Sequence, residues 1–407
     1  MSFLRGLSVN AVAVGLAFAL AFANSTWVAR ILGKEGLGHL AVAVTTVTVA
    51  GMVFGEWLTR GNSYHSGRDD RHAGSVWRNT TVYTLSLLPV LAVLAWVASV
   101  FYPEYVPRRQ ALLMAAMTAG VVAQKGFSGI LQGRDRLTAF ALVPLFFVST
   151  YFLLNLVGLG WLELGLNGAL AAWLCGVILS ASLAAVFSRG AGGVDGGLLR
   201  STMAVGGRGA MSATLIYLLF RSDIYLVEHY LGTETLGVYY IAVFIAEMIQ
   251  RGPNIAGAVL LPKVLRGTDD DHTMSLAVSR AAFLFSLAAA AGVIAGGRQA
   301  IGWVYDMTYA GAHTPLVWML PGLIACGFAS VLNTKLAGQG YPPVTMWAPG
   351  AALAMNVGLN LILIPRFGLV GAALSTSIAY VLWAAIVTVA YQRLTGLAWG
   401  RFVRVSA

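Results

Sequence analysis

Charged residues are scarce in this chain of 407 residues: only 10% are Asp, Glu, Lys or Arg. Hydrophobic residues make up 58%, and the mean hydropathy is positive. A water-soluble domain of this length does not tolerate such a composition on its surface. The shortage of charge therefore excludes a soluble protein and indicates a chain that lies in a lipid bilayer.

The chain also lacks the motifs of common enzyme chemistry. Its two cysteines, Cys175 and Cys326, both lie in apolar segments, where we expect packing residues and neither a disulfide nor a metal pair. Its six histidines show no metal-ligand spacing, and no P-loop motif is present to bind a nucleotide. We therefore predict that the protein is no enzyme and holds no metal or organic cofactor.

Long apolar runs fill the sequence instead. A membrane-spanning helix needs about 20 mostly apolar residues, so we predict an all-α, multi-pass membrane protein whose first helix is retained and not removed as a signal peptide. A break at residues 365–368 separates the last two runs, because proline does not extend a helix interior and glycine readily leaves it. The twelve predicted spans are 7–29, 37–58, 79–101, 110–132, 138–160, 165–187, 201–227, 236–260, 276–296, 314–334, 343–364 and 369–391.

The placement of the basic residues predicts the orientation. The formal net charge is +10, and most of the 26 Lys and Arg residues fall in the predicted loops and tails on the side of the N-terminus. Six fall on the opposite side: Arg30, Lys34, Arg108, Arg109, Arg298 and Arg366. Because cytoplasmic loops carry the excess of Lys and Arg, both termini are predicted to be cytoplasmic.

The two halves of the chain resemble each other. The pattern LGxExLG begins at Leu32 and again at Leu231, 199 positions later, and Asn155-Leu156 matches Asn360-Leu361 at a spacing of 205. Each half contains six predicted spans, and because six is even, both halves enter the membrane from the same side. Such parallel repeats are a transporter architecture with the substrate site between the halves. We predict an N-terminal lobe at 1–188, a flexible glycine-rich cytoplasmic linker at 189–200 and a C-terminal lobe at 201–407.

Four stretches carry a resemblance to a known family: WVARILGKEGLG at 27–38, ILQGRDR at 130–136, LGTETLGVYYIA at 231–242 and NLILIPRFGLVGAALST at 360–376. The chain resembles the Wzx-type polysaccharide (O-antigen) flippases of the multidrug/oligosaccharidyl-lipid/polysaccharide (MOP) exporter superfamily. The resemblance implies two six-helix bundles that rock between inward- and outward-open states in the cell membrane. The implied cargo is an undecaprenyl-pyrophosphate-linked oligosaccharide, moved from the cytoplasmic to the outer leaflet. The chain lacks the two further helices of the lipid II flippases, which makes a peptidoglycan precursor a poorer cargo.

Several basic residues fall within or beside the predicted spans, where a charge costs roughly 2.5–3.5 kcal/mol. They must face water, partners or a ligand. Since the planar fork of arginine binds phosphate through two parallel hydrogen bonds, we predict a cationic cleft that carries the pyrophosphate group. Its candidate residues are Arg30, Lys125, Arg208, Arg221 and Arg251.

Structural roles compete with this prediction at each position. Glu247 and Arg251 are four residues apart on one helix, a spacing at which they can pair, and so are Glu56 and Arg60. Lys125 and Arg208 can extend to the interface instead, and Arg221 can find a partner in another span.

Energy for transport has to come from outside the chain, since no nucleotide-binding motif is present. The alternatives are an ion gradient, the membrane potential or consumption of the cargo downstream. Asp223 and Glu247 are the acids well inside predicted spans, and intramembrane carboxylates are the usual proton or sodium sites. We predict that one of the two couples H+ or Na+ movement to transport, although a salt bridge would give the same pattern.

Two other functions compete. A membrane polysaccharide polymerase or ligase would carry a large outer loop, whereas the longest one predicted here runs only around 297–313. A multidrug exporter of the same superfamily would need acids in its cleft, yet four basic residues against two acids lie well inside the predicted spans. The resemblance implies as partners the lipid-linked glycan, membrane lipids and the polymerase and glycosyltransferases of the same pathway, and we expect no nucleic acid.

Overall fold

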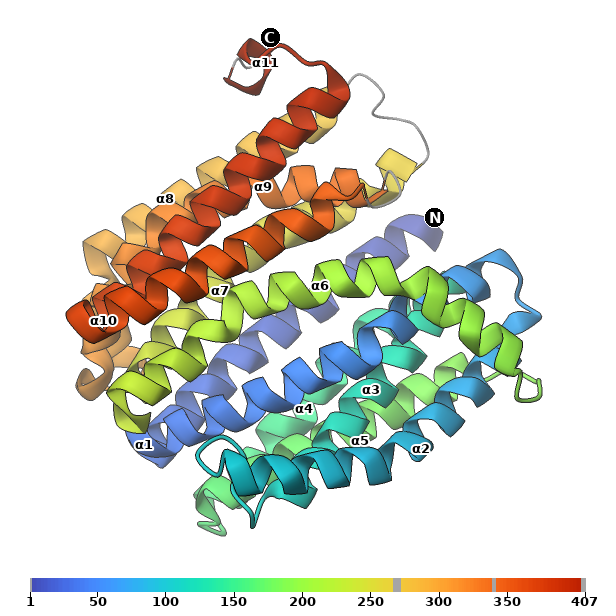
Figure 1. Ribbon diagram of the computed structural model, residues 1–407, viewed down its shortest axis with the longest axis horizontal. Helices are drawn as coiled ribbons and strands as arrows, with labels where there is room; N and C mark the ends of the chain where they lie inside the picture. Colours follow the sequence, from blue (N-terminus) through green and yellow to red (C-terminus); the bar gives the residue numbers. More distant parts are fainter. Residues whose placement is uncertain (1, 266–271, 339–341, 404–407) are drawn as a thin grey trace. The chain divides into compact units, whose positions relative to one another are not determined.

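The structure, a computed structural model, describes residues 2–265, 272–338 and 342–403, and its regular elements there are helices (Figure 1). Nine of them are long and apolar enough to cross a membrane. The elements in chain order are α1 (Ser2–Arg68), α2 (His72–Phe101), α3 (Ala111–Gly133), α4 (Leu137–Gly160), α5 (Gly165–Ser188), α6 (Gly196–Leu231), α7 (Thr233–Leu265), α8 (Thr273–Val304), the 3-10 helix η1 (Met307–Ala312), α9 (His313–Gly338), α10 (Val344–Thr395) and α11 (Gly400–Val403).

The chain divides into two compact units, Met1–Thr214 and Leu215–Ala407. Unit 1 contains α1 to α5 and the first part of α6, and α1 packs mainly against α3 and α4. The backbones of α1 and α3 approach closely through glycine: a Cβ atom on Gly129 would meet the backbone of Thr59. Small residues allow such approach in membrane helices, and this close interface forms the centre of unit 1.

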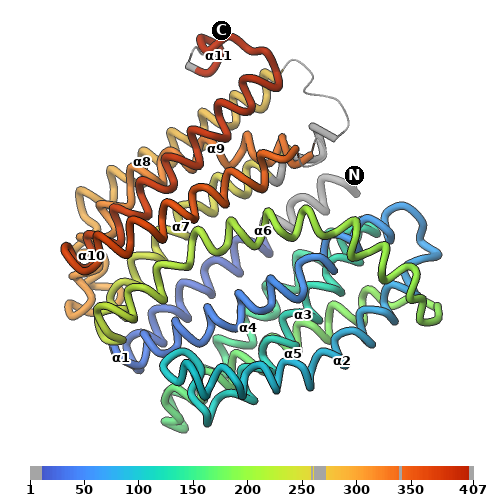
Figure 2. The backbone as a smooth tube through the Cα atoms, in the orientation of Figure 1, coloured from blue at the N-terminus to red at the C-terminus, as the bar shows by residue number. Residues whose placement is uncertain are grey.

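The long helix α1 is broken at Gly33, whose φ of 68° and ψ of −177° are not helical. The backbone path through this bend can be followed in Figure 2. Essentially only glycine adopts this backbone conformation, so the first two predicted spans, 7–29 and 37–58, lie on the two arms of one element.

Residues 189–195 form a segment without helix before α6. The segment is anchored and not a free tether: the side chain of Asn79 on α2 donates to the carbonyl of Asp195 at 2.7 Å and accepts from its backbone N–H at 2.9 Å. Helix α6 begins at Gly196. The residues predicted to form a flexible linker, 189–200, thus comprise this segment, which is hydrogen-bonded to α2 at Asp195, and the first residues of α6.

In unit 2, α9 packs against α7, α8 and α10. Of the apolar window in Met307–Gly338, 67% is buried, against 11% in α4, which marks α9 as a core helix and α4 as one with a lipid-facing surface. The predicted loop around 297–313 is largely helical, because α8 continues to Val304 and η1 follows.

Helix α10 is broken at Gly368, which has φ 58° and ψ −136°. Pro365 remains inside the helix, so the predicted break at 365–368 narrows to one residue. The two arms meet tightly beyond it, since a Cβ atom on Gly371 would collide with the carbonyl oxygen of Leu363.

Candidate functional site

The five predicted cationic residues divide between the two units. Arg30, Lys125 and Arg208 belong to unit 1, whereas Arg221 and Arg251 belong to unit 2. Both units contain an ion pair between a basic residue of this set and a buried or half-buried acid.

In unit 1 that acid is Glu56 on α1, which is 4% exposed. Its Oε2 atom lies 2.7 Å from Nζ of Lys125 on α3, and its Oε1 atom accepts a hydrogen bond from Nε of Arg60 at 3.1 Å. The predicted pairing of Glu56 with Arg60 is confirmed. Lys125 does not extend to the membrane interface as an unpaired charge, because its ammonium group forms an ion pair with Glu56 on the neighbouring helix.

Arg30 and Arg208 have exposed side chains. Arg30 lies beside the break at Gly33, whereas Glu56 lies about 35 Å further along the second arm of α1, from a rise of 1.5 Å per residue. The structure therefore does not bring Arg30 to the Lys125 pair.

In unit 2, Glu247 on α7 pairs with Arg221 on α6. The Nη2 atom of Arg221 lies 2.6 Å from Oε1 and 2.7 Å from Oε2 of Glu247, and its guanidinium stands 5.7 Å from the ring centroid of Tyr240. Only 12% of the Arg221 side chain is exposed. The spacing of four residues had placed Glu247 opposite Arg251 on the same helix, α7. In the structure the carboxylate of Glu247 forms an ion pair with Arg221, which comes from α6.

Asp223 lies two residues further along α6 and is 2% exposed. Its Oδ2 atom accepts hydrogen bonds from Oη of Tyr239 at 2.5 Å and from Oγ1 of Thr376 at 3.3 Å. Its Oδ1 atom is buried and has no hydrogen-bond partner among the described residues. An intramembrane carboxylate held by neutral groups, with one oxygen unsatisfied, is suited to take up a proton or a hard cation.

The polar network continues from Asp223 through α10. Asn356 donates to Thr376 at 3.4 Å, and its carbonyl oxygen accepts from Asn360 at 3.0 Å and from Ser222 at 3.1 Å. Sequence analysis did not connect these side chains to Asp223.

The internal repeat contained a signal for this network. The spacing of 199 places Asn24 opposite Asp223, and the spacing of 205 places Asn155 opposite Asn360. In unit 1 the corresponding pair is joined directly, since Nδ2 of Asn155 donates to Oδ1 of Asn24 at 2.8 Å. Unit 1 therefore has a neutral version of the polar contact that carries a carboxylate in unit 2.

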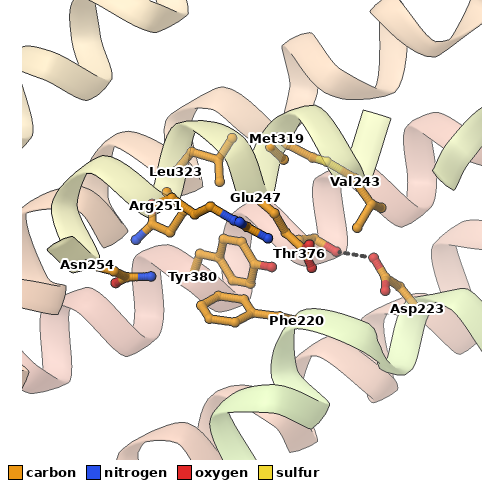
Figure 3. A pocket seen from close by; sticks show the side chains of 12 residues that line it. Phe220, Asp223, Val243, Glu247, Arg251, Asn254, Met319, Leu323, Thr376 and Tyr380 are labelled. Atoms are coloured by element: carbon orange, nitrogen blue, oxygen red, sulfur yellow. Dashed lines mark hydrogen bonds between the residues drawn. The ribbon is translucent and has the colours of Figure 1, made fainter. Parts of the chain in front are cut away.

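A pocket of about 190 Å³ lies in unit 2 between α6, α7, α9 and α10 (Figure 3). Asp223 and Thr376 reach it from one end, and Glu247 and Arg251 line it from α7 (Figure 3). In the part of the chain that the structure describes, no three His, Cys, Asp or Glu residues gather in a metal-binding group.

Comparison with protein families gives one match. The model of the family described as polysaccharide biosynthesis protein matches residues 3–266. No curated protein sequence matches the chain.

Solved membrane transporters share the fold. A lipid II flippase, MurJ, in an inward closed conformation has 14% identity and a TM-score of 0.82, with 97% of this chain and 89% of that chain covered. An inward-facing multidrug resistance MATE family transporter of the MOP superfamily has 17% identity and a TM-score of 0.74, over 93% of this chain and 94% of that one. A MOP superfamily transporter from Pyrococcus furiosus has 14% identity and a TM-score of 0.62, over 96% and 93%.

Proposed function

Since the chain belongs to the polysaccharide biosynthesis protein family, we propose that it flips an undecaprenyl-pyrophosphate-linked oligosaccharide from the cytoplasmic to the outer leaflet. The observation that carries the proposal is the family match over residues 3–266, joined to a fold shared with a lipid II flippase and MOP transporters. A flippase role fits both, because polysaccharide synthesis on a lipid carrier needs its intermediates moved across the bilayer.

The proposal includes a topology of twelve spans with cytoplasmic termini in the inner membrane. The breaks at Gly33 and Gly368 support it, because α1 and α10 can then supply two spans each. The proposal adds one span for each of α2 to α9, and it includes α7, which is not among the nine helices described above as apolar enough to cross a membrane. Alternating access of two six-helix lobes then moves the cargo as secondary transport, without enzyme chemistry. The partners proposed are the lipid-linked glycan, membrane lipids and the polymerase and glycosyltransferases that use it.

The basic residues have two roles in this proposal. Arg30, Arg208 and Arg251 have exposed side chains and contact the pyrophosphate as it passes. Lys125 and Arg221 are paired with Glu56 and Glu247, so these ion pairs place the two basic groups beside the path without leaving a buried charge unpaired.

Asp223 is the proposed ion-coupling residue, in preference to Glu247. The carboxylate of Glu247 is already neutralised by Arg221, whereas that of Asp223 is bonded to the hydroxyl groups of Tyr239 and Thr376. Binding and release of H+ or Na+ at Asp223 therefore changes the net charge of a buried site, which is the change that an ion-driven cycle requires.

A transport assay in proteoliposomes with a radiolabelled polyprenyl-pyrophosphate oligosaccharide tests the identity of the cargo. We expect the intact chain to move the lipid and Arg251→Ala to slow it about tenfold or more, because a charge-assisted contact to phosphate is lost. The matched control is Arg366→Ala, an exposed arginine outside the pocket, which should transport normally. Transport of a cationic dye and not of the lipid would replace this proposal with a multidrug exporter.

A further inference from the structure

Gln250 on α7 is a buried amide without a partner. It is 6% exposed, and neither its Oε1 nor its Nε2 atom has a hydrogen-bond partner among the described residues. Leaving a buried polar group unsatisfied is unfavourable, and Gln250 lines the pocket of unit 2. The unmet donor and acceptor call for a ligand group that offers both, such as a hydroxyl. A bare anion would satisfy only the donor, and a bare cation only the acceptor.

Two aromatic rings line the same pocket. Phe220 and Tyr380 meet edge to face, with ring centroids 4.9 Å apart and planes at 88° (Figure 3). Asn254, one helical turn beyond Gln250, adds a second amide to the wall. Aromatic rings next to amides match a sugar ring, which has apolar C–H faces and hydroxyl groups around its rim.

The volume of the pocket limits the size of the ligand that it can bind. About 190 Å³ is less than the roughly 300–1,000 Å³ of sites for drug-sized ligands. One part of the wall is apolar, from Val243, Met319 and Leu323, and suits the C–H face of one ring, while the charged side chains lie elsewhere in the lining. A whole oligosaccharide does not fit.

We infer that this pocket binds a single sugar ring of the cargo, held by the amide of Gln250 and packed against Phe220 and Tyr380. The inference rests on the proposed function and adds that the glycan, beyond its pyrophosphate, is recognised in unit 2. Arg251 lines the pocket as well (Figure 3), so a pyrophosphate attached to the bound ring has a cation within the same site.

The test compares two probes in proteoliposomes: polyprenyl pyrophosphate carrying one sugar, and the same lipid without it. For Gln250→Leu and Phe220→Leu we expect transport of the sugar-bearing lipid to fall about tenfold more than that of the sugar-free lipid. Gln132→Leu and Phe283→Leu, an exposed amide and a partly exposed ring outside the pocket, should transport both lipids like the intact chain. Equal effects on both lipids, or no effect, would overturn the inference.

A binding measurement separates failure of the inference from failure of the proposed function. Ala246 lines the pocket, and in a background without the native cysteines Ala246→Cys reports access to it by its rate of maleimide labelling. Protection by the sugar-bearing lipid at least about tenfold stronger than by the sugar-free lipid supports the site, even if neither lipid is transported. Equal protection by both lipids, or none, overturns it.

Discussion

At the scale of single residues, the pair of Arg221 and Glu247 gives the first prediction. Glu247→Gln leaves a guanidinium that is 12% exposed without its counter-charge. Breaking a buried pair by removing one partner is strongly unfavourable, and we expect the free energy of unfolding to fall by about 3 kcal/mol. Thermal or denaturant unfolding of the purified protein in detergent measures it.

Two further variants show whether this loss comes from the stranded charge. Glu35→Gln removes an acid whose side chain is 78% exposed and should change the free energy of unfolding by less than about 0.5 kcal/mol. Replacing both partners, with Arg221→Met and Glu247→Leu, should recover most of the loss because neither member of the pair is left as an unpaired charge. A double variant as unstable as Glu247→Gln would contradict the explanation.

Asp223 gives a prediction about energy coupling. Asp223→Asn keeps the size of the side chain and one acceptor oxygen for Tyr239 and Thr376, but it replaces the other oxygen with an amide group and removes the charge. We expect lipid transport to lose its response to an imposed H+ or Na+ gradient, because the site no longer changes charge. Transport rates in proteoliposomes with each gradient imposed separately measure this and identify the ion, and Glu35→Gln should keep the response. A gradient response that survives in Asp223→Asn would remove Asp223 from the coupling.

The residues of the site were only partly predictable from the sequence. Hydropathy placed Asp223, Glu247 and Arg251 in spans, and the spacing of four between Glu56 and Arg60 predicted their pairing correctly. The pairing of Glu247 with Arg221 was not predictable, because it depends on how α6 and α7 face each other. Gln250 gave no signal, since an amide in an apolar helix looks the same whether it is satisfied or not.

At the scale of elements, the breaks within α1 and α10 depend on two glycines. Gly368→Ala forces a side chain into φ 58° and ψ −136°, and we expect a loss of about 1–3 kcal/mol in the free energy of unfolding. Gly358→Ala in the same helix is the matched control. A Cβ atom at either position meets nothing within 4 Å, so only backbone conformation separates the two.

Gly358→Ala should leave the protein unchanged or up to about 1 kcal/mol more stable, because alanine favours a helix over glycine. Melting in detergent compares the two variants. Equal melting temperatures would mean that the backbone at Gly368 relaxes without cost.

Hydropathy predicted the helices well, because each span must satisfy its backbone hydrogen bonds internally while it faces lipid. It did not predict how the helices end. The predicted connections 30–36 and 365–368 narrow to single non-helical residues, Gly33 and Gly368. The apolar sequence near Val304 did not mark where α8 stops. The glycine-rich stretch before α6 gave no sign that the backbone of Asp195 is hydrogen-bonded to Asn79 of α2.

At the scale of the whole molecule, the proposed twelve spans predict which side of the membrane each break faces. Single cysteines that replace Glu35 or Phe367, both exposed positions beside the breaks, should react with an impermeant maleimide in intact cells. A single cysteine that replaces Arg71 should react only after lysis. The background carries Cys175→Ser and Cys326→Ser. Labelling of Arg71→Cys in intact cells would reverse the topology, and labelling of neither break would contradict the count of spans.

In unit 1 the position that the repeat relates to Asp223 is occupied by Asn24, which carries no charge. This difference between the two units has an electrical consequence. Among the buried acids that the structure describes, Asp223 has no ion-pair partner, so the proposed cycle carries one coupling ion at this site. A cation entering and a pyrophosphate leaving move charge in the same direction. Each turnover is then electrogenic and produces an inward current, and the interior-negative voltage of a cell drives both movements by about 2.3 kcal/mol per charge per 100 mV.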